Sequence, residues 1–390
     1  MTQLDSGSTP DKRPLNGVRL SLRWLGLLCL PAILASLISY TSALQNSGNT
    51  TAVEQSVEWL RGHHYGDTVS WIERLYYSHN QPPRGGTLAN GLPAAVSNAT
   101  TTTPVPGAQG TALDRIVPLA GQPLKGEGVW QPYGDAANGS AAMQVAYLRP
   151  DQVHGTVLAA VVRIDQTAAS FQLVPGSGEP GHGPWPSGMA VAAGDLPRLL
   201  AAFNSGFRIA DSRGGYMEDA QTAAPLRQGA ASLVIDASGS LDVVHWDASA
   251  AAKKPTAVRQ NLDLIVDGGQ LVSGLDNNAG ERWGHTVGNE LFVWRSGVGV
   301  DAKGRILYVA SEGLSVATLA ALLQRAGAVR AMELDINHAW VSFNVFHHDA
   351  SGAMSGTKLL DGMSKPASRY LSPDARDFIA VLARKPVGGR

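Results

Sequence analysis

The stretch of sequence that decides the fold is Ala331-Met332-Glu333-Leu334-Asp335-Ile336-Asn337. Its side chains alternate with a period of two, which predicts a β-strand. One face of this strand is wholly apolar, and the other face carries only polar side chains, namely Glu333, Asp335 and Asn337. Two interpretations fit this pattern: an edge strand whose polar face meets water, or a strand whose polar face lines a functional site.

The residues before this stretch favour the second interpretation. Ser315 is a suitable helix N-cap, residues 316–326 carry apolar side chains at helical spacing, and Gly327 supplies a stop. A helix, a glycine turn and a strand that ends in acidic and amide side chains is a common way to build a site. We therefore expect residues 331–337 to lie at the centre of a site.

The N-terminal part of the chain predicts a membrane segment. Residues 24–44 contain no charged side chain, and the preceding polar tail, residues 1–23, contains Lys12, Arg13, Arg19 and Arg23. About 20 apolar residues span a bilayer as a helix. A signal peptide cleaved after Thr41-Ser42-Ala43 is the alternative, but the leading segment is long for one. We expect a single-pass membrane anchor with a cytoplasmic N-terminus and an extracytoplasmic C-terminal domain.

Composition restricts the function classes. The net charge of the 390-residue chain is −1, so nothing in the charge balance indicates a nucleic-acid partner. Cys29 is the single cysteine, which excludes an intrachain disulfide and a cysteine-based metal site.

After the anchor we expect a juxtamembrane region followed by a strand-rich domain. Residues 45–112 combine a juxtamembrane helical pattern with a Pro/Gly/Thr-rich spacer, and residues 113–390 form the exported domain. Two predicted hairpins share a turn spelling, at Asp236–Gly239 and Asp301–Gly304. Residues 297–302 formally match a dinucleotide-binding fingerprint, but they enter a hairpin instead of a helix, so we reject that match.

The polar strand suggests two kinds of chemistry. Residues two apart on a strand lie about 6.6 Å from each other, so the carboxyl groups of Glu333 and Asp335 fit the separations of about 5–9.5 Å found in glycosidases. Such a pair divides into a protonated acid and an ionised base. Alternatively, these two carboxylates and Asn337 supply the oxygen ligands that a divalent cation prefers.

Three stretches of the sequence resemble the phosphodiester glycosidase family. They are Asn204-Ser-Gly-Phe207, Arg295-Ser-Gly-Val-Gly-Val300 and Leu334-Asp-Ile-Asn337. Members of the family carry Asn-Gly-Gly-Phe-like, Arg-Thr-Ala-Ile-Gly-Val-like and Leu-Asp-Gly-Gly-Gly-Ser motifs in this order. The triple glycine is replaced here by Ile336-Asn337-His338, so the third motif departs from the family pattern.

The resemblance implies an α+β fold, with a mixed, largely antiparallel sheet and a few helices. It also implies hydrolysis of glycosyl-phosphodiesters or related cell-envelope glycosides, with a carbohydrate or glycosyl-phosphate substrate. Asp335 carries over from the family motifs as a catalytic residue, and Asn204, Gly206 and Arg295 carry over as substrate-binding residues.

Glu333 and Asn337 enter the predicted site from the strand pattern alone. We expect Glu333 and Asp335 to divide the acid and base or nucleophile roles, whereas Asn204 and Asn337 would bind sugar hydroxyls. Arg295 would engage a phosphate through its planar fork. No cofactor is expected, although a divalent cation stays possible.

Two alternative functions fit the same sequence. One is a non-catalytic module that binds envelope glycans through aromatic faces, for which the candidates are Trp185, Trp246, Trp283 and Trp340. The other is a metal-dependent hydrolase that uses the same acidic strand.

Overall fold

The computed structural model describes residues 34–42, 44, 51–63, 65, 68–69, 71–72, 75, 79, 81–95, 115–119, 121–137, 140–181, 183–277, 282–284, 292–349 and 351–385. The predicted cytoplasmic tail 1–23 and residues 24–33 of the predicted anchor lie outside these ranges. Within them, no helix reaches the length and apolar character that a bilayer crossing requires.

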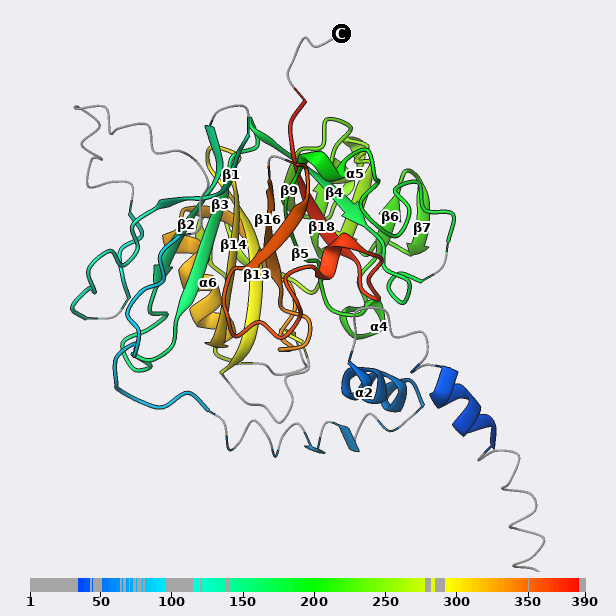
Figure 1. Cartoon of the computed structure of the whole chain (residues 1–390), viewed down its shortest axis with the longest axis horizontal. Helices are drawn as coiled ribbons and strands as arrows, with labels where there is room; N and C mark the ends of the chain where they lie inside the picture. Colours follow the sequence, from blue (N-terminus) through cyan, green and yellow to red (C-terminus); the bar gives the residue numbers. More distant parts are fainter. Residues whose placement is uncertain are drawn as a thin grey trace, which may run out of the picture.

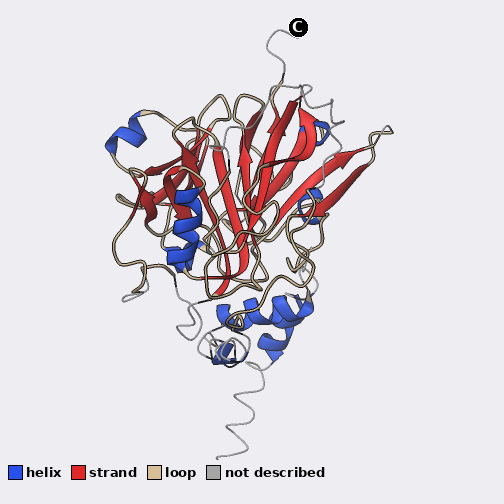
Figure 2. Ribbon diagram, turned by 90° about the vertical axis from the view of Figure 1, so that its left-hand side faces the viewer, coloured by secondary structure: helices blue, strands red, loops and turns tan. Residues whose placement is uncertain are grey.

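Strands make up most of the body, and the helices lie at its periphery (Figures 1 and 2). The first sheet has eight strands in the order β1 (Gln131–Ala137), β2 (Ser140–Leu148), β3 (Ala159–Ile164), β14 (Ile306–Leu314), β13 (Val293–Asp301), β15 (Ala328–Glu333), β11 (Leu264–Asp267) and β12 (Gln270–Leu271). The second has the order β7 (Gln221–Ala224), β6 (Tyr216–Glu218), β10 (Ala257–Gln260), β8 (Ala231–Ile235) and β9 (Leu241–His245). The third has the order β17 (Met354–Lys358), β16 (Phe343–His348), β5 (Leu199–Asn204), β18 (Phe378–Ala383) and β4 (Ala169–Val174).

Neighbouring strands in all three sheets run antiparallel. The helical elements are few and mostly short: α2 (Ala52–Gly62), α4 (Ile209–Ser212), α5 (Ala248–Ala252), α6 (Val316–Arg325) and the 3₁₀ turns η1 (Leu196–Arg198) and η4 (Arg369–Leu371). The predicted α+β fold with largely antiparallel pairing is therefore confirmed.

The helix predicted before the polar strand is α6, and its N-cap residue and its terminal glycine have the predicted roles. The Ser315 side chain accepts a hydrogen bond from the backbone of Thr318, and the Thr318 side chain accepts one from Ser315 in return. Gly327 follows the helix with φ +103°, a conformation that glycine adopts without strain. Leu319 and Leu323 are fully buried where α6 covers one face of the first sheet (Figure 1).

The polar stretch lies inside a sheet, as the favoured interpretation requires, but less of it is strand than predicted. β15 ends at Glu333, so Leu334–Asn337 is not part of the strand. β15 also lies between β13 and β11, which makes the edge-strand interpretation wrong. After the strand, Leu334 still donates to the carbonyl of Ser296 on β13, at 2.8 Å, before the chain turns away.

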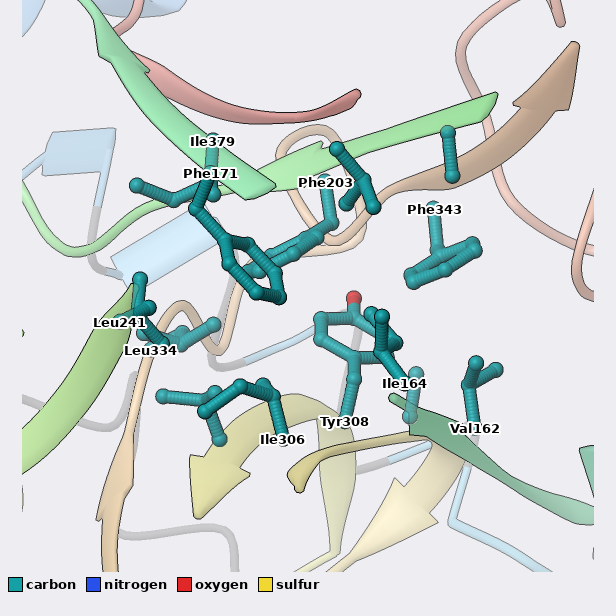
Figure 3. Packing of buried hydrophobic residues seen from close by; sticks show 14 of the residues in the cluster. Val162, Ile164, Phe171, Phe203, Leu241, Ile306, Tyr308, Leu334, Phe343 and Ile379 are labelled. Atoms are coloured by element: carbon teal, nitrogen blue, oxygen red, sulfur yellow. The ribbon is translucent and has the colours of Figure 1, made fainter. Parts of the chain in front are cut away.

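The first and third sheets meet in the largest buried cluster. Phe203 and Phe343 of the third sheet stack with their ring centroids 5.7 Å apart, and Tyr308 of the first sheet lies 5.0 Å from Phe343 (Figure 3). Neighbouring residues of β14 alternate between this cluster and the one beneath α6. The first sheet is therefore buried on both faces, which accounts for its nearly continuous apolar strands.

The two hairpins share a turn sequence because an aspartate side chain forms hydrogen bonds within each turn. Oδ1 of Asp236 accepts hydrogen bonds from the backbone N–H of Ser238 and Ser240, at 2.8 and 3.0 Å. Asp301 binds the N–H groups two and four residues ahead in the same way, and so does Asp349. The aspartate side chain thus organises the turn, and the repeated spelling does not indicate a repeated domain.

The glycines of the rejected fingerprint serve close packing. A Cβ on Gly297 would lie 3.1 Å from the Leu319 side chain, and one on Gly299 would lie 2.9 Å from the carbonyl oxygen of Arg330. β13 therefore needs glycine where α6 and β15 approach its backbone.

Gly299→Ala should lower the free energy of unfolding by about 1–3 kcal/mol, because the added methyl group has no space between β13 and β15. Urea denaturation of the two proteins measures this difference. Gly194→Ala is the matched control, since a Cβ there meets no atom within 4 Å. Equal destabilisation by both substitutions would contradict the packing argument.

Candidate active site

The three motif stretches meet at the side chain of Ser296. Its Oγ accepts a hydrogen bond from Asn204 Nδ2 at 3.0 Å and one from the backbone of Asp335 at 3.2 Å. It donates to the carbonyl oxygen of Asp335 at 3.1 Å. All three residues are buried. Asn204 and Asp335 lie 92 and 39 positions from Ser296 in the chain, and the single hydroxyl group of Ser296 holds them together.

Asn204 stands at the end of β5 and is fully engaged within the protein. Its Oδ1 accepts hydrogen bonds from the Tyr308 hydroxyl at 3.0 Å and from the backbone of Ser342 at 3.1 Å. These contacts join the first and third sheets beside the motif junction. The predicted contact of Asn204 with a sugar hydroxyl stays a prediction.

Asp335 is held by one backbone group and one arginine. Its Oδ1 accepts the N–H of Asn337 at 2.9 Å, and its Oδ2 lies 3.3 Å from Arg376 Nη2. The same Nη2 donates to the carbonyl oxygen of Gly206 at 3.1 Å. Arg376 therefore links two predicted site residues, although it lies outside the three motif stretches. Its position between Asp374 and Asp377, directly before the last strand, was the available signal.

Glu333 and Arg295 form a second buried ion pair. Arg295 donates through Nη1 to Glu333 Oε1 and through Nε to the carbonyl oxygen of Leu314 at 2.7 Å. Glu333 Oε2 has no partner among the described residues. Burial raises the pKa of Glu333, Arg295 opposes this rise, and the nearby charge of Asp335 adds to it.

Asn261 is a further residue at this site that no sequence motif indicates. Its Nδ2 donates to the carbonyl oxygens of Glu333 and Leu334, at 2.8 and 2.9 Å. Its Oδ1 finds no partner in the described part of the chain, although the side chain is buried. A Cβ on Gly206 would lie only 3.3 Å from Asn261 Cγ, so the glycine permits this close approach.

Cations gather around the ring of Trp340. Lys365 Nζ lies 4.9 Å from the ring centroid, and the guanidinium carbons of Arg369 and Arg376 lie 5.3 and 4.9 Å from it. Arg369 also pairs with Asp374 through two hydrogen bonds of 2.8 and 3.0 Å. Arg376 Nε is buried and has no partner among the residues described here. This group favours an anionic ligand.

Asn337 forms a turn in place of the family's triple glycine. Its side-chain Oδ1 accepts the N–H of Ala339 at 2.9 Å, while its own N–H binds Asp335. Asn337 is partly exposed and His338 is exposed. A side-chain-stabilised turn therefore follows Asp335 here.

The structure bears on both alternative functions, the glycan-binding module and the metal-dependent hydrolase. Trp246, Trp283 and Trp340 are buried, and only Trp185 among the four candidate tryptophans is partly exposed. For a metal site, the described residues contain no group of three His, Cys, Asp or Glu side chains that could hold an ion. Glu333 and Asp335 each face an arginine, whose charge opposes a cation at that position.

Comparison with known proteins supports the family resemblance. The phosphodiester glycosidase family model matches residues 198–335. This span contains Asn204, Gly206, Arg295, Glu333 and Asp335, and it ends two residues before Asn337. The resemblance found in the three motifs is thereby confirmed. No curated protein matches the chain.

Three solved structures are similar to the chain at low identity. The catalytic domain of zebrafish N-acetylglucosamine-1-phosphodiester alpha-N-acetylglucosaminidase, auto-inhibited by its pro-peptide, is 15% identical, with a TM-score of 0.42 over 68% of this chain and 91% of that one. A hypothetical protein from Synechocystis is 14% identical, with a TM-score of 0.41 over 65% and 64%. A putative exported protein from Burkholderia pseudomallei is 15% identical, with a TM-score of 0.30 over 59% and 75%.

Proposed function

We propose that this chain is a membrane-anchored hydrolase of glycosyl-phosphodiesters or related cell-envelope glycosides. The observation that carries the proposal is the Asp335 carboxylate, held by Arg376 and by the backbone of Asn337 where the matched segments meet. The anchor at residues 24–44 and the extracytoplasmic position of residues 113–390 rest on the sequence pattern alone.

The surroundings of Asp335 suit an anionic substrate. Arg376, Arg369 and Lys365 lie around Trp340, and the carboxylates of Asp335 and Asp374 balance two of these three positive charges. In a buried site such charges act on a phosphate more strongly than they would in water. Arg376 Nε has no partner among the described residues, so its planar guanidinium offers a hydrogen bond beyond those it makes to Gly206 and Asp335.

The two carboxyl groups differ in the way that acid and base roles require. Glu333 has a raised pKa, and its Oε2 has no partner within the described ranges, so it is the group we assign to hold and deliver a proton. Asp335 pairs with a guanidinium, and we assign it the ionised role of base or nucleophile. In this proposal the glycosidic C–O bond breaks, the phosphate leaves with its electron pair, and water supplies the new hydroxyl group on the sugar.

Arg376→Lys should lower kcat/KM for a sugar phosphodiester by about 10- to 100-fold, because lysine keeps the charge but loses the planar fork. Turnover of the matching uncharged glycoside should change far less. The assay uses the full-length chain with both substrates, and Arg282→Lys, at an exposed pair with Asp263, is the control. An unchanged ratio between the two substrates would rule out a phosphate contact by Arg376.

A further inference from the structure

Exposed apolar side chains concentrate in the part of the chain that precedes the folded body. Among the described residues, twelve large apolar side chains are exposed, and eight of the twelve belong to residues 34–75. Each of the eight is at least half exposed, and they are Leu34, Leu37, Ile38, Val53, Tyr65, Trp71, Ile72 and Leu75. Single exposed apolar residues are ordinary, but a concentration of them marks an interaction surface.

The exposed apolar side chains divide at the end of the predicted anchor. The first three belong to the charge-free stretch 24–44 that predicts this anchor. The other five, from Val53 to Leu75, follow that stretch, and we call them the juxtamembrane apolar group. Within this group Trp71, Ile72 and Leu75 each have helical backbone, and their spacing of three and four residues is that of one helix face.

The helix α2 is fastened to the end of the anchor stretch. Tyr40 Oη lies 2.7 Å from Ser56 Oγ, and Trp59 Nε1 donates to Ser39 Oγ at 3.0 Å. The rings of Tyr40 and Trp59 meet edge to face, with their centroids 5.3 Å apart. Because α2 folds back on residues 39–40, a bilayer around the anchor stretch would lie directly beside α2.

The polar groups between residues 39–40 and α2 are satisfied by one another. His63 Nδ1 lies 2.8 Å from the carbonyl oxygen of Trp59, and His63 Nε2 lies 3.2 Å from Ser39 Oγ. The His63 ring also stacks on the Trp59 ring, with centroids 4.1 Å apart. Polar groups that are paired in this way lose no hydrogen bond when a lipid surface replaces water beside them. These residues therefore suit a place at the boundary of a bilayer.

The charge of this region decides which part of a bilayer it contacts. Residues 45–79 contain four acidic and two basic side chains, a net charge of −2 with histidine neutral. Attraction to anionic headgroups therefore does not hold the region on a membrane. Its apolar and aromatic side chains must supply the contact, and tryptophan and tyrosine favour the boundary between headgroups and acyl chains.

We propose that the juxtamembrane apolar group lies in the lipid surface of the membrane, at the boundary between headgroups and acyl chains. This inference rests on the anchor that the proposed function includes, because the anchor brings the group to the bilayer. In Figure 1, α2 lies at the end of the body where α4 follows the Asn204 stretch. Lipid contact beside α2 holds that end of the body, which carries the motif junction, toward the membrane.

Fluorescent labels on single cysteines test this placement in the full-length chain, reconstituted into phosphatidylcholine vesicles. One label is attached to the native Cys29, inside the predicted anchor. A second is attached to Thr68→Cys in a Cys29→Ser background, since Thr68 is exposed and precedes Ile72 by four residues. Lipids that carry a nitroxide quencher at the headgroup, or near the end of the acyl chain, report the depth of each label.

The label at position 68 should be quenched mainly by the headgroup nitroxide, at a depth of about 5–10 Å. The label on Cys29 should be quenched mainly by the acyl-chain nitroxide. Ala237→Cys in the Cys29→Ser background is the control that should stay unquenched, because Ala237 is exposed in the turn between β8 and β9. The next residue, Ser238, accepts a hydrogen bond from Arg384, directly after β18. Since β18 begins opposite Asn204, this turn lies at the other end of the body.

Trp71→Ser/Leu75→Ser in the Thr68→Cys protein should lower quenching by the headgroup nitroxide by about fivefold or more, because two large apolar side chains no longer hold the segment in lipid. Val117→Ser is the matched control. It removes an exposed apolar side chain from another part of the chain, and it should leave the quenching unchanged.

The two label positions separate this inference from the anchor. If Cys29 is quenched and position 68 is not, the inference is wrong and the anchor stands. If position 68 is quenched and Cys29 is not, the lipid contact is supported and the anchor is removed from the proposed function. Absence of quenching at both positions would overturn both. Quenching at position 68 that Trp71→Ser/Leu75→Ser leaves unchanged would also overturn the inference, since the apolar group would not be its cause.

Discussion

Asp335→Asn should lower the turnover of a glycosyl-phosphodiester by about 100- to 10,000-fold, the range that general acid–base catalysis contributes. Asparagine has the same shape, so its side-chain oxygen can still accept the N–H of Asn337. What is lost is the negative charge beside Arg376 and the ability to act as base or nucleophile. A large loss of rate with little loss of fold is therefore expected.

Kinetics of the full-length chain, together with its circular dichroism spectrum, separate these two effects. Asp263→Asn is the matched control because it makes the same chemical change at an exposed carboxylate. Glu333→Gln should also lower turnover, since it removes the proposed proton donor. If both Asp335→Asn and Glu333→Gln fold normally and keep the wild-type rate, the active site lies elsewhere.

The local elements of this fold could be predicted because their signals are short-range. The helix α6 follows from Ser315, its apolar spacing and Gly327, all within a few residues. The hairpins at Asp236 and Asp301 follow from turns that their own side chains organise. Such features depend on neighbours in the sequence, so one sequence is enough to find them.

The partners of the site residues could not be predicted, because pairing between distant strands determines them. The antiparallel register of β18 with β5 places Phe378 opposite Asn204. Arg376, two residues earlier, thereby reaches Gly206 and Asp335. Similarly, the planar fork of Arg295 predicted a contact with the phosphate or another anionic group of the substrate, and only the tertiary structure shows the Glu333 carboxylate on that guanidinium.

Composition was a weaker guide than periodicity for the region before the domain. The Pro/Gly/Thr-rich composition predicted a spacer, and residues 81–95 of that region make hydrogen bonds to the folded body. Gln81 donates to the carbonyl oxygen of Phe292, and Gly85 donates to that of Val153. A segment without helical or strand periodicity can still dock through its backbone groups, which amino-acid composition does not reveal.

Arg259→Met should lower the free energy of unfolding by about 3–5 kcal/mol, the cost of leaving one partner of a buried ion pair alone. Arg259 Nε lies 2.7 Å from Asp377 Oδ2, and both side chains are 1% exposed. Arg259 belongs to β10 of the second sheet, and Asp377 directly precedes β18 of the third, so the pair joins two sheets beside the motif junction. Arg259 also donates to the carbonyl oxygen of Phe207.

Urea denaturation measures this loss, and two further variants identify its cause. Arg282→Met, which removes an exposed pair with Asp263, should cost no more than about 1 kcal/mol. The double variant Arg259→Met/Asp377→Leu should recover most of the stability, because it no longer leaves a charge buried without a partner. If the double variant is no more stable than Arg259→Met, the loss comes from packing and from the Phe207 contact. In that case the ion pair is not what holds the second and third sheets together at the site.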